Sequence, residues 1–131
     1  MKALLIALLM ITAPVEPSEV WKAVQRYDYI ESHNLKRVKV SCYTAGEGAH
    51  TADGSIPVEG MVSSNREHLG MDMILYTDDL IPEARFQCTD IGGHPMLVKG
   101  TAVDFYREDL SRCYEFVNTH SQYVWVEWIE R

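Results

Sequence analysis

Hydrophobic and polar residues alternate over several short stretches of this chain. Between residues 35 and 43, Val38, Val40 and Cys42 fall on one face, which predicts a strand with one buried side. Further stretches rich in β-branched and aromatic residues predict strands at 71–76, 84–89, 101–106 and 123–129. The last stretch is apolar on both sides, which is typical of a strand in the middle of a sheet. The chain is therefore expected to be mainly β.

Helical spacing occurs in two places. Residues 19–30 follow Ser18, a good helix cap, and place Val20, Val24 and Tyr27 on one face. This helix lies in a segment, 14–34, that precedes the strands, and it is either an ordinary packing helix or a tether. A second helix is expected within 107–118, with four residues on one face: Leu110, Cys113, Tyr114 and Val117.

A long polar stretch from residue 44 to residue 57 separates the first strand from the rest. It is rich in Gly, Ala and small polar residues, so we expect a loop that either borders a site or is mobile. Its polar candidates are His50, Thr51 and Asp53. We interpret His50 as a solvated loop histidine rather than a base.

The chain begins with one lysine and a run of nine apolar residues at positions 3–11. This run is too short to span a bilayer, but it suits the hydrophobic region of an export signal. We therefore predict a signal peptide at residues 1–13 and a periplasmic, secreted or cell-wall-associated protein. The alternatives are a buried N-terminal helix and an uncleaved anchor.

Size and charge limit the classes of protein to consider. The chain has 131 residues, of which 47% are hydrophobic, enough for one domain with a core of its own, expected at 35–131. The net charge of −7 argues against nucleic acid or an anionic membrane surface as the main partner. It does not bear on a neutral sugar polymer.

Three cysteines, Cys42, Cys88 and Cys113, allow at most one disulfide within the chain and leave one thiol over. No C-x-x-C spacing is present, so neither a zinc site nor a redox motif is indicated. Three free buried thiols and one disulfide both remain open.

Two carboxylates stand close together along the chain. Asp90 is followed by Gly92 and Gly93, which allow unusual backbone turns and leave room for another group to approach. Asp104 lies within an apolar strand, where aspartate is uncommon. Two acids on neighbouring segments suit the cleavage of a glycosidic bond. The same residues also suit a tight turn and a helix cap.

Several segments together resemble one known family. They occur in the following order: Cys42-Tyr-Thr-Ala, Thr51-Ala-Asp-Gly, Leu69-Gly, Asp90-Ile-Gly-Gly, Lys99-Gly and Val103-Asp-Phe-Tyr. This order is similar to that of the three-aspartate (3D) domain, a double-psi β-barrel of bacterial cell-wall lytic transglycosylases, including the catalytic domain of membrane-bound lytic transglycosylase A. The resemblance covers residues 38–130. It implies a six-stranded double-psi barrel with a few short helices.

The resemblance also implies a substrate and a site. Peptidoglycan glycan strands would be cleaved to 1,6-anhydromuropeptides, with Asp104 as the single acid and base and Asp90 as the second family aspartate. Six residues would bind substrate, and neither metal nor cofactor would be needed: Tyr43, Thr44, Asn65, Gly92, Gly93 and Lys99.

One position departs from the family pattern. Asn65 stands where the family has its first aspartate, and it keeps the hydrogen-bonding shape but not the charge. Two other hypotheses therefore stay open. One is a barrel that binds peptidoglycan or another polysaccharide without cutting it, for which exposed Trp125 or Trp128 would provide flat surfaces. The other is a structural or partner-binding protein.

Overall fold

The computed structural model describes residues 16–131, so the expected signal peptide lies outside the described residues. The chain divides into two units, at residues 1–35 and 36–131. In the first, helix α2 (Pro17–Ser32) begins with a proline, whose fixed φ suits the first turn. Glu16, rather than the expected Ser18, occupies the cap position, and its side chain makes no capping hydrogen bond.

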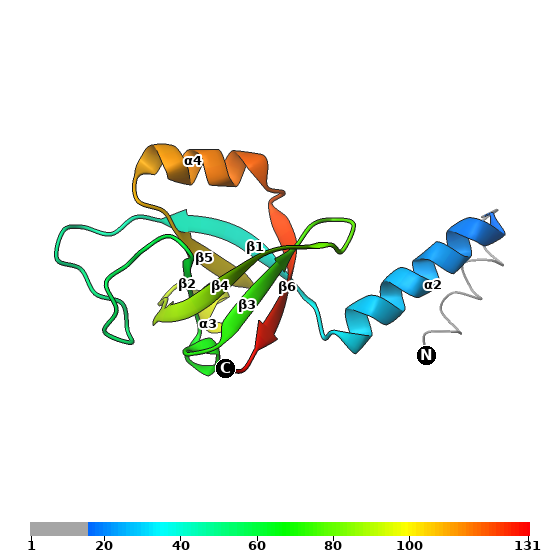
Figure 1. The fold of residues 1–131 in the computed structure, drawn as a ribbon, viewed down its shortest axis with the longest axis horizontal. Coiled ribbons are helices and arrows are strands. Elements are labelled where there is room, and N and C mark those ends of the chain that lie inside the picture. Colours follow the sequence, from blue (N-terminus) through cyan, green and yellow to red (C-terminus); the bar gives the residue numbers. More distant parts are fainter. Residues whose placement is uncertain (1–15) are drawn as a thin grey trace. The chain divides into compact units, whose positions relative to one another are not determined.

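The second unit is a closed barrel of six strands (Figure 1), and the chain is mainly β as expected. The strands and helices, in chain order, are β1 (Lys36–Tyr43), β2 (Met61–Ser64), the 3-10 helix η1 (Arg66–His68), β3 (Asp72–Tyr76), β4 (Pro82–Ile91), α3 (Pro95–Val98), β5 (Ala102–Tyr106), α4 (Leu110–Thr119) and β6 (Tyr123–Ile129). Strand β2 was not expected, because four residues are too few to show a clear alternation.

The strands follow one another around the barrel in the order β1-β5-β2-β4-β3-β6. Two neighbouring pairs are parallel, β1 with β5 and β2 with β4, and the other four pairs are antiparallel. Every strand from β1 to β6 thus has a partner on both sides, which satisfies its backbone hydrogen bonds without a free edge. No helix within residues 16–131 is both long and apolar enough to cross a membrane.

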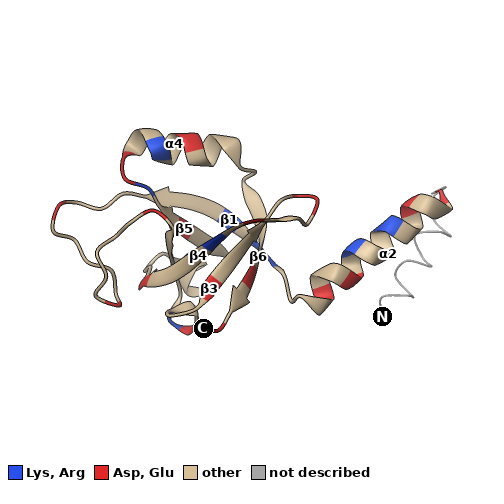
Figure 2. Ribbon diagram, in the orientation of Figure 1, with Lys and Arg blue, Asp and Glu red and all other residues tan. Residues whose placement is uncertain are grey.

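The inside of the barrel is filled by alternate residues of each strand. These include Val38 and Val40 on β1, Val62 on β2, Val103 and Phe105 on β5, and Val126 on β6. Phe116 of α4 joins them, so this helix covers part of the core beside β1 (Figure 1). Lys and Arg are scattered among more numerous Asp and Glu positions along the ribbon (Figure 2).

Helix α4 turns a different face to the core from the one expected. Its side chain cap is Asp109, which accepts a hydrogen bond from the Arg112 N–H at 2.9 Å. Cys113 and Phe116 are buried, whereas Leu110, Tyr114 and Val117 are exposed. The disulfide between Cys113 and Cys42 explains the rotation, because it holds this side of the helix against the end of β1.

The cysteine alternatives are thereby resolved. Cys42 and Cys113 form one disulfide, and Cys88 is a free thiol in the barrel core. Burial raises the pKa of the Cys88 thiol to about 11, so it stays protonated and unreactive at neutral pH.

Candidate functional site

Asp90 and Asp104 lie on two strands that flank β2. Ser63 of β2 is the register partner of Asp104 on β5 and also of Asp90 on β4. Register partners point to the same face of a sheet, so the three side chains share one face. It is the face opposite the core, because Val103 and Phe105 on either side of Asp104 point inward. The two aspartate Cα atoms are two strand spacings apart, roughly 10 Å.

A bulge in β4 brings Asp90 to this face. Val62 pairs with Cys88, but the next residue, Ser63, pairs with Asp90, so Thr89 is an extra residue in β4. Without that extra residue, strict alternation would turn Asp90 to the same side as Cys88, into the apolar core. The bulge therefore decides that Asp90 and Asp104 belong to one site.

Asp104 is a half-buried acid with one neutral hydrogen-bond donor. The Ser41 hydroxyl of β1 donates to Asp104 Oδ1 at 3.0 Å. Burial raises the pKa of the Asp104 carboxyl, the Ser41 hydrogen bond lowers it, and the negative charge of Asp90 raises it further. The net change in pKa is upward, so Asp104 holds a proton at a higher pH than an ordinary aspartate.

Asp90 has the opposite kind of environment, with backbone donors around it. Its Oδ1 accepts hydrogen bonds from the N–H groups of Ile91 at 2.9 Å and Ala52 at 3.0 Å. The two acids therefore differ in surroundings, one desolvated beside a hydroxyl and the other held by N–H groups.

Tyr43 lies beside both acids. Burial raises the pKa of its hydroxyl above the usual range, and the charges of Asp90 and Asp104 raise it further. Its ring meets that of Tyr106 edge to face, with the centroids 5.5 Å apart. The Tyr43 oxygen is buried and has no hydrogen-bond partner among residues 16–131. A neutral phenol with a free donor therefore lies next to the two carboxyl groups.

The tip of the loop between β1 and β2 is held beside Asp90 by hydrogen bonds. The Asp53 N–H donates to the Thr89 carbonyl at 3.1 Å, next to the bond from Ala52 to Asp90. The Asp53 carboxylate accepts from the Thr51 hydroxyl at 2.8 Å and from the Ser55 N–H at 2.9 Å. The Asp53 carboxylate thus stabilises a turn at residues 51–55, in which Thr51 is buried.

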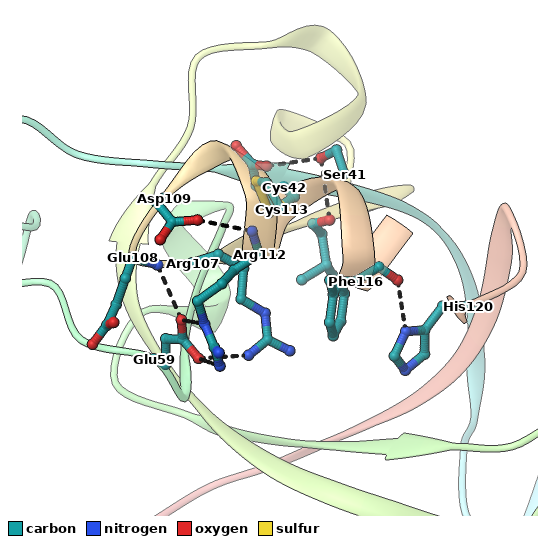
Figure 3. Close-up of a disulfide and its surroundings, with 12 residues drawn as sticks. Ser41, Cys42, Glu59, Arg107, Glu108, Asp109, Arg112, Cys113, Phe116 and His120 are labelled. Carbon is teal, nitrogen blue, oxygen red and sulfur yellow. Dashed lines mark hydrogen bonds and ion pairs between the residues drawn. A yellow bond between two sulfur atoms is a disulfide. The ribbon is translucent and has the colours of Figure 1, made fainter. Parts of the chain in front are cut away.

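The same loop is held at its other end by an ion-pair cluster (Figure 3). Glu59 accepts from Arg107 Nη1 at 2.9 Å, from the Glu108 N–H at 3.1 Å and from the Arg112 guanidinium. Arg112, and after it these other donors, lower the pKa of Glu59 to about 2. The cluster lies beside the Cys42–Cys113 disulfide (Figure 3), so loop, α4 and the end of β1 are joined at one place.

The remaining expected site residues are less closely grouped. Thr44 is half-buried directly after Tyr43, and Lys99 is an exposed residue at the end of α3. Neither Gly92 nor Gly93 has a positive φ, so the expected unusual turn is wrong. Gly92 is needed for space instead, because a Cβ there would approach Leu97 Cδ1 to 2.1 Å, and Gly93 is open.

Both polar atoms of the Asn65 side-chain amide make hydrogen bonds to the backbone nearby. Its Oδ1 accepts from the His68 N–H at 3.1 Å and caps η1, while its Nδ2 donates to the Val98 carbonyl at 3.4 Å. Asn65 and Gly92 line a pocket of about 480 Å³, whose wall does not include Asp90 or Asp104.

Both tryptophans of β6 are half-buried, and the Trp128 ring stacks on His68 with the centroids 3.8 Å apart. Neither is the fully exposed platform that polysaccharide binding by Trp125 or Trp128 would use.

Sequence reasoning missed Ser41, Ser63 and Ala52. Ser41 occupies a polar position of an alternating strand. This pattern indicates that Ser41 faces away from the core, but it does not indicate which strand lies beside it. Its partner Asp104 is 63 positions away along the chain, and no local pattern indicates that β1 and β5 are adjacent.

A protonatable acid beside a charged carboxylate and a neutral phenol can deliver a proton and stabilise a positive charge. Within residues 16–131, no three His, Cys, Asp or Glu side chains gather in a way that could hold a metal ion.

A comparison with protein-family models finds no matching family, and a comparison with curated proteins finds no matching relative.

Proposed function

We propose that this protein is a lytic transglycosylase-like enzyme that cleaves the glycan strand of peptidoglycan, with Asp104 as its single acid and base. The observation that carries the proposal is the pairing of Asp104 and Asp90 across Ser63, with the Asp104 pKa raised by burial. We also propose that the barrel is of the double-psi type, which its two parallel strand pairs support.

In the proposed reaction, protonated Asp104 gives its proton to the glycosidic oxygen as the bond to the anomeric carbon breaks. The C6 hydroxyl of the same sugar then attacks the anomeric carbon and loses its proton to the Asp104 carboxylate. This closes the 1,6-anhydro ring and restores the acid. No water is consumed, so a second catalytic base is not required.

Asp90 and Tyr43 would support this acid without exchanging protons. Burial, and after it the negative charge of Asp90, raise the pKa of Asp104. The same negative charge would stabilise the developing positive charge on the sugar. The buried Tyr43 hydroxyl stays neutral because its pKa is raised, so it adds no further charge beside the two acids.

Export fits this substrate, which lies outside the cytoplasmic membrane. The signal peptide expected at residues 1–13 would carry the protein there. The Cys42–Cys113 disulfide supports the same location, because disulfides persist mainly in oxidising compartments.

A second candidate is a barrel that binds peptidoglycan without cutting it. The role of Asn65 favours it, since this side chain is occupied by His68 and Val98 and brings no charge to the aspartate pair.

The test is digestion of purified peptidoglycan, followed by mass spectrometry of the released products. The parent protein should release anhydromuropeptides, and Asp104→Asn should abolish the release, because an amide cannot give and recover the proton. Asp90→Asn should retain some activity, with a loss of roughly 10²-fold for one electrostatic stabiliser.

Asp79→Asn, a change at an exposed turn, is the matched control and should behave as the parent. Co-sedimentation with peptidoglycan without any anhydro product would support the binding module instead. Full activity of Asp104→Asn would exclude Asp104 as the acid.

A further inference from the structure

A separate pocket of about 480 Å³ lies at the end of β4, the strand that carries Asp90. Its lining residues are Asn65, Arg66, Glu67, Ile91, Gly92 and Val98. Ile91 and Gly92 directly follow Asp90, so this wall continues from the proposed catalytic strand. The volume is that of a small-ligand site.

The walls of this pocket are joined by direct contacts. Asn65 at the start of η1 donates to the Val98 carbonyl of α3 at 3.4 Å, which links two sides. The Gly92 N–H donates to the Ser64 carbonyl at 2.9 Å, and the missing side chain of Gly92 lets Leu97 approach. The pocket is therefore formed before any ligand enters.

The lining has the wrong chemistry for a bare sugar and suits a charged peptide. None of its six residues is aromatic, so it lacks the flat rings on which sugars stack. Ile91 and Val98 supply apolar surface, and Val98 is 57% exposed. The Arg66 side chain is exposed and makes no ion pair or hydrogen bond within residues 16–131, while Glu67 beside it offers a negative charge.

We propose that this pocket binds the short peptide that is attached to the glycan strand. The free Arg66 guanidinium would take a peptide carboxylate, Glu67 would face the peptide amine, and Ile91 and Val98 would contact the alanine methyl groups. This inference rests on the proposed function, because it places the glycan at Asp90 and Asp104 and its peptide branch in the pocket at the end of β4.

The test measures peptide binding alone, so it does not depend on turnover. The probe is the tetrapeptide L-alanyl-γ-D-glutamyl-L-lysyl-D-alanine, titrated into the full chain while amide NMR signals are followed. Shifts are expected at Arg66, Ile91, Gly92 and Val98. Arg66→Gln should weaken binding about fivefold to tenfold, as for the loss of one partly exposed charge-assisted contact.

Arg37→Gln is the matched control, because Arg37 is also an exposed arginine but lies outside the pocket, over the Tyr123 ring. It should leave peptide affinity unchanged. A second probe has both of its carboxylates converted to amides. The parent should bind this probe as weakly as Arg66→Gln does, and Arg66→Gln should not discriminate between the two peptides.

The two proposals fail in different ways. No shift at millimolar peptide, or equal weakening by both arginine variants, would overturn the peptide site even if anhydro products are released. Peptide binding that requires Arg66 but occurs without glycan cleavage would keep this site and remove the enzyme.

Discussion

The Cys42–Cys113 disulfide offers the clearest quantitative test of this structure. It joins the end of β1 to α4 across a sequence separation of 71 residues. Replacing both cysteines, as Cys42→Ala with Cys113→Ala, removes this cross-link while keeping two small side chains. For a closed loop of this length, the lost chain constraint corresponds to about 4 kcal/mol at 25 °C.

A loss of that size is a large part of the stability of a small domain, for which about 5–15 kcal/mol is usual. The midpoint of thermal unfolding should fall by about 20 °C for a domain of this length. The free energy of unfolding is measured by urea titration at neutral pH. The parent protein with a thiol reductant should then resemble the double variant, and the double variant should not respond to reductant.

Cys88→Ala is the matched control, since Cys88 is buried but unpaired. It should cost only the small contact loss of a trimmed core side chain, and it should keep the response to reductant. Equal stability of the double variant and the parent, or a parent that is indifferent to reductant, would refute the cross-link between β1 and α4.

Two further predictions concern pH. Since Arg112 and Arg107 lower the pKa of Glu59, the stability that Glu59 provides is present above its unfolded pKa of 4.5 and is lost as the pH falls toward 2. Glu59→Gln should therefore remove this acid-dependent loss in urea titrations, and parallel curves for parent and variant would contradict it. Asp104 has the opposite sign, because its raised pKa lets the folded state keep a proton that the unfolded chain has released. Asp104→Asn should therefore gain stability relative to the parent as the pH rises from the ordinary pKa of 3.8 through the raised pKa of the folded state. If the unfolding free energies of Asp104→Asn and the parent differ by the same amount at acid and at neutral pH, the Asp104 carboxyl is not buried.

Local patterns were sufficient for much of the fold. The alternation of Val38 and Val40 with polar neighbours predicted β1, because one side of that strand is buried and the other is not. The apolar stretch ending at Ile129 predicted β6, which indeed has a partner on each side. Strand β2 was not predicted, because four residues are too few to show a period. The buried face of α4 was predicted wrongly, because the disulfide determines which face of the helix packs on the barrel.

For the candidate site, the residue types alone singled out Asp90 and Asp104 as acids in unusual surroundings. A role for Asn65 in substrate binding stays a prediction.

Only the tertiary structure decided how these groups meet. Ser41 reaches Asp104 because β1 and β5 are neighbours, although they are far apart along the chain. Asp90 faces the same side as Asp104 only because Thr89 forms a bulge opposite β2. The sequence by itself thus indicated the buried side of β1, because alternation is a local pattern. Strand pairing and register depend on closure of the whole barrel, and they determined which buried and half-buried groups share a site.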